Sequence, residues 1–178
     1  MWYIIVAILS TCTAYASERI LLYKSDITIH ADATMSVKET ITVQSTGDTI
    51  QRGIVREFPT QYKDRWGNNY HVGFQVIEIV RDGHAELYRI ESVDNGKKIY
   101  IGHSDRWLDP GIYTYTITYT TNRQLGFFEK HDELYWNAIG TGWRLPIDKA
   151  VAIVHLPAAI PRDPGSRSEE RRVGKECR

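Results

Sequence analysis

Residues 112–120 read IYTYTITYT, and this stretch decides the fold class. Its odd positions from 113 to 119 hold Tyr, Tyr, Ile and Tyr, while the even positions between them all hold Thr. Side chains of a β-strand alternate between two faces, so the pattern predicts a strand with one large apolar face and one hydroxyl face. Residues 35–44 alternate in the same way. Their mostly apolar face consists of Met35, Val37, Glu39, Ile41 and Val43.

Further short stretches extend this pattern in both directions. Residues 19–30 precede the strand at 35–44 across a short connection at 31–33 and predict its partner. The dipeptides Asp82–Gly83 and Asn95–Gly96 indicate hairpin turns, because Gly, and to a lesser extent Asn and Asp, tolerates positive φ. We therefore expect three strands in meander order, a loop with a turn at its end, a segment that is irregular or a strand, and a last strand. Their ranges are 74–80, 86–93 and 97–101 for the meander, 102–111 for the loop, 127–137 for the uncertain segment and 150–156 for the last strand.

No stretch carries an amphipathic helical repeat of about 12 residues or more. The sequence therefore predicts an all-β domain, an antiparallel β-sandwich that is immunoglobulin-like or similar. The predicted sandwich has seven or more strands, and one interpretation is that this chain lacks some strands of the complete sandwich.

The two ends of the chain differ from the domain between them. Residues 2–9 are all apolar and are followed by Ala14-Tyr15-Ala16, which predicts a signal peptide over residues 1–16. No basic residue precedes this run, and the alternatives are an uncleaved anchor, a buried strand or a lipoprotein signal with Cys12. Residues 165–178 (GSRSEERRVGKECR) predict an unstructured tail, either foreign to the protein or a natural charged tail. The domain then spans residues 17–164.

Charge and cysteine content exclude several classes of protein. The chain has 22 basic and 22 acidic residues, but residues 17–164 have 17 and 19, a net charge of −2. That balance argues against a nucleic-acid partner. Both cysteines, Cys12 and Cys177, lie outside the predicted domain, so a disulfide scaffold, a thiol nucleophile and a cysteine-ligated metal are excluded there.

Three motifs carry a family resemblance: RGIVREFP at 52–59, GIYTYTITY at 111–119, and DELYWN at 132–137 followed by Gly140, Trp143 and Pro146-Ile147. Together they resemble the N-terminal part of a predicted bacterial membrane protein family, domain-of-unknown-function family 2207 (DUF2207). The resemblance implies an exported, extracytoplasmic β-rich domain, anchored in the membrane through segments absent from this chain. It implies no established activity, so no catalytic residue and no cofactor is transferred.

Two acidic residues are candidates for chemistry. Asp132 and Glu133 are adjacent in DELYWN and suggest a hydrolase that acts on an envelope glycan or peptide. Adjacent strand residues point to opposite faces, which argues against cooperation between the two carboxylates. The alternative is that one of them pairs with Arg52 or Arg56 while the other is solvated.

The chain offers no metal-binding pattern. Its six histidines lack the short spacing of metal ligands, and DRWGNN at 64–69 is closer to a polar turn than to a calcium loop. No metal or cofactor site is expected.

The aromatic residues suggest binding. Trp66, Trp107 and Trp143 each stand beside an arginine, a composition that is frequent at interfaces, and exposed aromatic rings also stack on sugars. The alternative is that Trp136 and Trp143 pack in the core. The interaction or structural candidates are therefore Arg52, Arg56, Asp132, Glu133, Trp136 and Trp143. We expect a non-enzymatic module that binds an envelope protein or glycan, against the alternatives of a hydrolase and of a fragment that is inactive alone.

Overall fold

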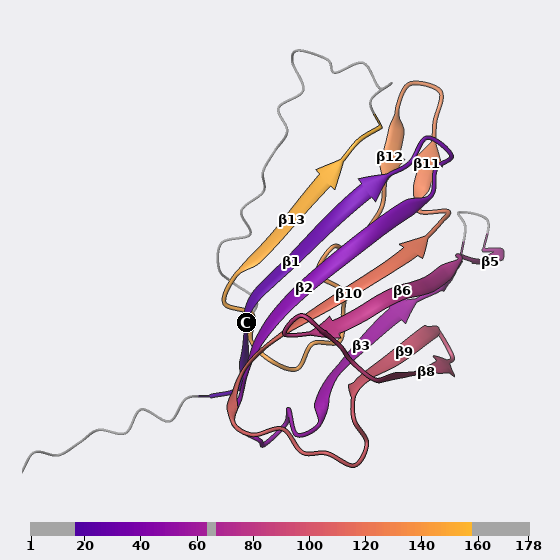
Figure 1. Cartoon of the computed structure of the whole chain (residues 1–178). Coiled ribbons are helices and arrows are strands. Elements are labelled where there is room, and N and C mark those ends of the chain that lie inside the picture. Colours follow the sequence, from indigo (N-terminus) through magenta and orange to yellow (C-terminus); the bar gives the residue numbers. More distant parts are fainter. Residues whose placement is uncertain (1–16, 64–66, 158–178) are drawn as a thin grey trace, which may run out of the picture.

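The computed structural model describes residues 17–63 and 67–157, and within them every regular element is a β-strand (Figure 1). The all-β prediction is confirmed. The strands are β1 Arg19–Ile29, β2 Met35–Ser45, β3 Gly53–Pro59, β4 Gln61–Lys63, β5 Asn69–His71, β6 Phe74–Arg81, β7 His84–Ala85, β8 Tyr88–Val93, β9 Gly96–Gly102, β10 Gly111–Thr121, β11 Leu125–Phe127, β12 Asp132–Leu134 and β13 Ala150–His155.

The larger sheet has six strands in the order β13-β1-β2-β10-β6-β7. Its centre is the β2–β10 pair, in which Ile41 lies opposite Tyr115 and Val37 opposite Tyr119. The alternation predicted for both strands is confirmed, because the odd residues of β2 are fully buried and so are Tyr115, Ile117 and Tyr119. Burial of these large side chains supplies most of the hydrophobic stabilisation.

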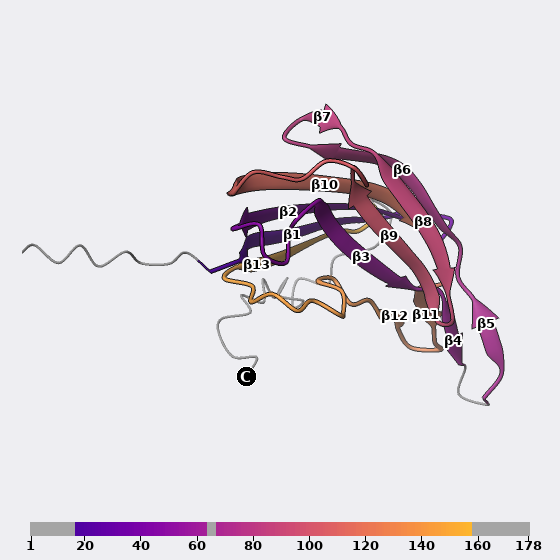
Figure 2. The same ribbon diagram turned by 90° about the horizontal axis from the view of Figure 1, so that it is seen from below.

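A smaller sheet in the order β3-β9-β8 covers one face of the larger sheet (Figure 2). Its inward side chains include Ile54, Phe58, Ile99 and Ile101, which join one core cluster with the buried residues of β1, β2 and β10. Two further two-stranded ribbons, β4–β5 and β11–β12, lie at one end of the molecule (Figure 2).

The predicted three-strand meander is wrong in one respect. The Asp82–Gly83 turn does form a hairpin, but it pairs β6 only with the two residues of β7. The amide of Glu86 then donates to the Ile79 carbonyl, and the Leu87 carbonyl accepts from Gly102 in β9. The chain therefore crosses from the larger to the smaller sheet between these two residues. Alternation along 86–93 predicted a strand, but it carried no information about which sheet the strand joins.

The last strand also departs from the antiparallel expectation. β13 pairs in parallel with β1, with Tyr23 opposite Ala150 and Thr28 opposite His155. The irregular segment that leads to it, residues 135–149, runs across the core. It packs six half-buried side chains against the core cluster: Trp136, Ala138, Ile139, Trp143, Leu145 and Ile147.

A carboxylate holds the start of β1 to the loop before β3. Glu18 is buried and accepts hydrogen bonds from the backbone amides of five consecutive residues, at distances from 2.7 to 3.2 Å. These residues are Thr46, Gly47, Asp48, Thr49 and Ile50. Burial opposes ionisation of Glu18, but the backbone amides outweigh it and lower the pKa of this carboxyl below its ordinary value of 4.5.

The predicted signal peptide (1–16) and tail (165–178), with Cys12 and Cys177, lie outside the described residues. So do Arg65 and Trp66. Among the residues that the structure does describe, no helix has the length and apolar character needed to cross a membrane.

Candidate functional site

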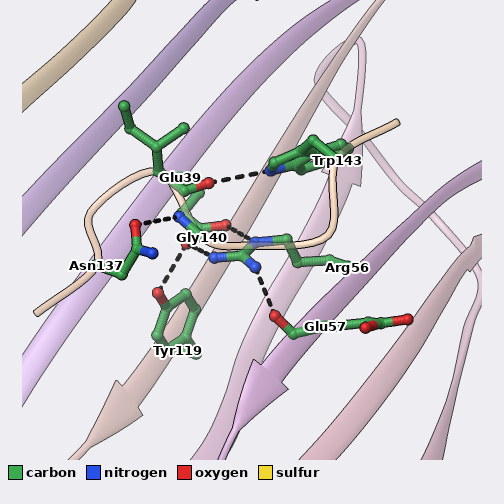
Figure 3. A network of polar contacts seen from close by, with 8 residues as sticks. Glu39, Arg56, Glu57, Tyr119, Asn137, Gly140 and Trp143 are labelled. Atoms are coloured by element: carbon green, nitrogen blue, oxygen red, sulfur yellow. Dashed lines mark hydrogen bonds and ion pairs between the residues drawn. The ribbon is translucent and has the colours of Figure 1, made fainter. Parts of the chain in front are cut away.

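Arg56 and Glu39 form a buried ion pair between the two sheets (Figure 3). The guanidinium donates from Nε and Nη2 to the two carboxylate oxygens, both at 2.8 Å, and the side chains are 2% and 0% exposed. A third nitrogen, Nη1, donates to the Glu57 carbonyl at 2.5 Å, and the group lies 4.2 Å from the centre of the Phe58 ring. Burial lowers the pKa of Arg56, but the Glu39 carboxylate more than offsets this, so the pKa is raised and Arg56 stays charged.

Two buried tyrosines complete this polar cluster. The Tyr119 hydroxyl donates to Glu39 Oε1 at 2.8 Å. The Tyr23 hydroxyl is also buried, but it has no hydrogen-bond partner among the described residues. Burial first, and then the neighbouring Glu39 charge, raises the pKa of both phenols far above 10, so neither ionises near neutral pH. In this buried cluster the two charges and the Tyr119 hydroxyl are therefore hydrogen-bonded, whereas the Tyr23 hydroxyl has no partner among the described residues.

The segment after DELYWN covers the ion pair. Gly140 lies against the Arg56 guanidinium, and a Cβ atom at this position would come within 2.3 Å of Nη1. The Gly140 amide donates to Asn137 Oδ1 at 3.1 Å, which holds the turn in place (Figure 3). Arg56 also lines two pockets of about 310 and 210 Å³, and Gly140 lines the smaller one.

Both candidate tryptophans of this segment pack inward. Trp143 meets the Tyr23 ring edge to face at 5.8 Å and donates from Nε1 to the Ile139 carbonyl at 3.0 Å. Trp136 lies 6.4 Å from the Tyr119 ring, and its buried Nε1 has no acceptor among the described residues. Their rings therefore contribute to packing over the ion pair rather than to an exposed surface.

Among the described residues, neither candidate carboxylate forms an ion pair with an arginine. Asp132 and Glu133 are both exposed on the short strand β12, opposite Phe127 and Gly126 of β11. The alternative in which Arg56 pairs with one of them is wrong, because Arg56 is paired with Glu39. Being consecutive in a strand, Asp132 and Glu133 point to opposite sides of the ribbon.

Arg52 lies on the outside of the molecule, beside a broad groove. Its guanidinium stacks over the Trp107 ring at 4.8 Å, and Trp107 is 59% exposed. The adjoining groove has a volume of about 580 Å³ and crosses the outer face of the smaller sheet where β3, β8 and β9 lie side by side. We call it the outer-face groove.

Two glycines form the floor of the outer-face groove. Gly53 and Gly102 lie opposite each other across β3 and β9, with φ of 144° and 133°. A Cβ atom at Gly53 would lie 1.8 Å from the Ile101 carbonyl oxygen, and one at Gly102 would lie 1.9 Å from the Arg52 carbonyl oxygen, so only glycine fits. The adjacent outward residues are larger: Tyr100 lies opposite Arg89, and the Arg89 guanidinium stacks over the Tyr100 ring at 4.6 Å.

The charge of the outer-face groove differs from that of the domain. Two arginines and a histidine line it, and none of its lining residues is acidic. These basic residues are Arg52, Arg89 and His103.

Within residues 17–63 and 67–157, no three His, Cys, Asp or Glu side chains come close enough to hold a metal ion.

The sequence reasoning missed Glu39, Tyr119 and Gly140. A signal for the first was present, because Glu39 stands in the middle of an otherwise apolar strand face. Arg56 likewise stands between Ile54 and Phe58 on an inward face. A single charge of each sign on two buried faces predicts a pair, since an unpaired buried charge is costly.

A family model for the N-terminal domain of a predicted membrane protein, DUF2207, matches residues 19–175. This chain belongs to that family. The matched range extends past residue 164 into the charged C-terminal segment, which lies outside the described residues.

The DUF2207 chain is also similar to the uncharacterized protein YciQ of Escherichia coli strain K12. The two are 26% identical over 132 residues, which is 74% of this chain and 21% of YciQ. The chain thus spans about a fifth of the length of this relative.

Solved structures show weaker similarity. An M1 zinc metallopeptidase from Deinococcus radiodurans matches with a TM-score of 0.46 and 17% identity, over 78% of this chain and 32% of the peptidase. A native yeast LTA4 hydrolase matches with a TM-score of 0.44 and 14% identity, over 60% of this chain and 15% of the hydrolase.

Proposed function

We propose that this DUF2207 domain is a non-enzymatic, extracytoplasmic binding or assembly module of a membrane-anchored bacterial protein. Its partner is a protein or glycan of the cell envelope. The domain belongs to a family of predicted membrane proteins, which supports attachment to a membrane. The apolar run at 2–9, followed by Ala14-Tyr15-Ala16, supports export.

One observation carries the binding role: two aromatic rings stacked under arginines lie in and beside the outer-face groove. Trp107 is held under Arg52, and Tyr100 is held under Arg89. Aromatic and arginine side chains provide most of the energy in protein interfaces, and the same rings stack on sugars. The two stacks restrict these side chains before any partner arrives, which lowers the entropy lost on binding.

The buried polar residues favour a scaffold role over chemistry at that position. Arg56 and Glu39 satisfy each other, and the segment around Gly140 covers them. Buried charges that are paired and closed off hold a fold together but do not contact a substrate.

The test is co-sedimentation of the purified full chain with isolated bacterial envelopes, separated into sacculus and membrane fractions. The variants Trp107→Ala and Arg52→Ala are expected to lower the bound fraction at least about fivefold, as expected for interface anchors of this type. Lys38→Ala is the matched control, because Lys38 is exposed on β2 in the other sheet.

Each result of this experiment has a definite meaning. Loss of binding for the two groove variants with Lys38→Ala unchanged supports the proposal, and the fraction that binds identifies the partner as wall or membrane material. Absence of binding by the wild-type chain, or equal binding by all variants, overturns it.

A further inference from the structure

Strand β8 is the outermost strand of the smaller sheet, and within the described residues only β9 pairs with it. Its side chains are mostly exposed, including two that point to the core side of the sheet. Tyr88 and Ile90 lie opposite the buried residues Ile101 and Ile99 of β9, yet they are 44% and 42% exposed. An exposed edge strand with apolar side chains favours pairing with another chain.

The backbone of β8 presents a regular set of free groups. The Leu87 carbonyl points to β9, since it accepts from Gly102. Amide and carbonyl directions alternate along a strand, so Arg89 and Glu91 also face β9. The amides and carbonyls of Tyr88, Ile90 and Ser92 therefore point away from the sheet.

The side chains of β8 are self-complementary about its centre. Arg89 and Glu91 flank Ile90, point to the outer face and form an ion pair within the strand. If a second β8 lies antiparallel with Ile90 opposite Ile90, then Arg89 of each copy lies opposite Glu91 of the other. Opposite charges directly across a strand pair are stabilising, and like charges are destabilising.

We propose that a second copy of this chain pairs with the free edge of β8, antiparallel, about a two-fold axis that passes through Ile90. In this register the three residues with free backbone groups face one another: Ile90 opposite Ile90, and Tyr88 opposite Ser92. These pairs form up to about six main-chain hydrogen bonds. The two Arg89–Glu91 pairs then lie at the closer, non-hydrogen-bonded positions, where side chains interact most strongly.

The dimer joins two three-stranded sheets into one continuous sheet. It also places Glu91 of the other copy beside Arg89, which lines the outer-face groove. A contact of six residues on each side is small for a stable dimer, so we expect weak association in solution. Tethering to one membrane raises the effective concentration of the two copies and strengthens the same contact.

The test is a charge exchange measured by sedimentation equilibrium of the purified full chain, with Cys12 and Cys177 replaced by serine. Arg89→Glu or Glu91→Arg places like charges opposite each other twice, so each is expected to weaken the dimer at least about tenfold. The double variant R89E/E91R restores opposite charges and the dimer. A mixture of the two single variants is also expected to form a heterodimer, although each alone is monomeric.

Disulfide formation measures the register independently. A mixture of Arg89→Cys and Glu91→Cys chains is expected to form covalent heterodimers, because these positions face each other at a non-hydrogen-bonded site. A mixture of Arg89→Cys and Ser92→Cys chains is the out-of-register control. A monomeric wild type at millimolar concentration, a dimer indifferent to the single charge changes, or equal cross-linking in both mixtures overturns the proposal.

Discussion

The guanidinium of Arg56 lies directly against Gly140, where a Cβ atom would come 2.3 Å from Nη1. The two residues are far apart in sequence, and Arg56 is fixed on its other side by Glu39. The contact therefore joins the covering segment to the ion pair between the sheets.

Gly140→Ala is expected to destabilise the domain by about 3 kcal/mol, because the added methyl group overlaps the buried Arg56 side chain, which its ion pair with Glu39 holds in place. Gly142→Ala is the matched control. Gly142 has a similar positive φ of 85°, but its Cβ would lie 3.5 Å from the Glu57 carboxylate, so only backbone strain of about 1 kcal/mol is expected. Urea unfolding measures both, and equal losses would contradict the steric explanation.

Glu39→Met and Arg56→Met are each expected to cost about 3–5 kcal/mol, because each leaves a buried charge without its partner. The double variant Glu39→Met with Arg56→Met removes both charges and is expected to recover much of that loss. Additive losses in this double-mutant cycle would show that the two residues do not act as a pair.

The two buried tyrosines should respond differently to loss of the hydroxyl. Tyr119→Phe removes a hydrogen bond to Glu39 and is expected to cost about 1–3 kcal/mol. Tyr23→Phe removes a hydroxyl that has no hydrogen-bond partner among the described residues, so it is expected to cost less than about 1 kcal/mol or to stabilise the protein. Thermal unfolding of the two variants side by side gives the comparison, and a larger loss for Tyr23→Phe would refute it.

Glu18 makes stability depend on pH in the acid range. Its folded-state pKa lies below the ordinary value of 4.5, so its contribution is complete above pH 4.5 and is lost as the pH falls through the folded value. Glu18→Gln is expected to lower the free energy of unfolding by about 2 kcal/mol at pH 7 and to have little effect at the acid limit. The control Asp48→Asn changes an exposed carboxylate of the same loop. A difference between Glu18→Gln and wild type that is independent of pH would contradict this mechanism.

Asp132→Asn and Glu133→Gln are expected to change stability by less than about 0.5 kcal/mol, because both side chains are exposed. If the domain is a binding module, neither variant alters the breakdown of purified envelope polysaccharide. If both variants fold normally and a polysaccharide-degrading activity of the wild type disappears, the domain is an enzyme and the proposed function fails.

Local sequence patterns predicted most of the larger sheet. The alternation in 35–44 and 112–120 correctly indicated which residues are buried, because period two is a direct consequence of strand geometry. The Asp82–Gly83 dipeptide correctly placed its turn, whereas the second turn lies at residues 94–95, one residue before the predicted Asn95–Gly96. Sheet membership was not predictable in this way, because β6 and β8 have similar patterns but join different sheets through the crossover at Glu86 and Leu87.

Long-range contacts were not predicted either, because a local pattern does not show which distant segment a residue contacts. Residues 53–59 were recognised as a motif but not as strand β3, although Ile54, Arg56 and Phe58 alternate inward. One alternative paired Asp132 or Glu133 with Arg52 or Arg56, whereas the structure pairs Arg56 with Glu39 from β2. The parallel addition of β13 beside β1 depends on the path of residues 135–149, which no local period describes.

The position of β13 has a mechanical consequence. β1 and β13 are the first and last strands among the described residues, and they lie side by side in parallel. A force that pulls the start of β1 and the end of β13 apart therefore loads all the hydrogen bonds between them at once, in shear, instead of opening them one by one. Resistance to such a force is governed by the unfolding rate. A domain held between a membrane and an envelope partner would carry tension through this strand pair.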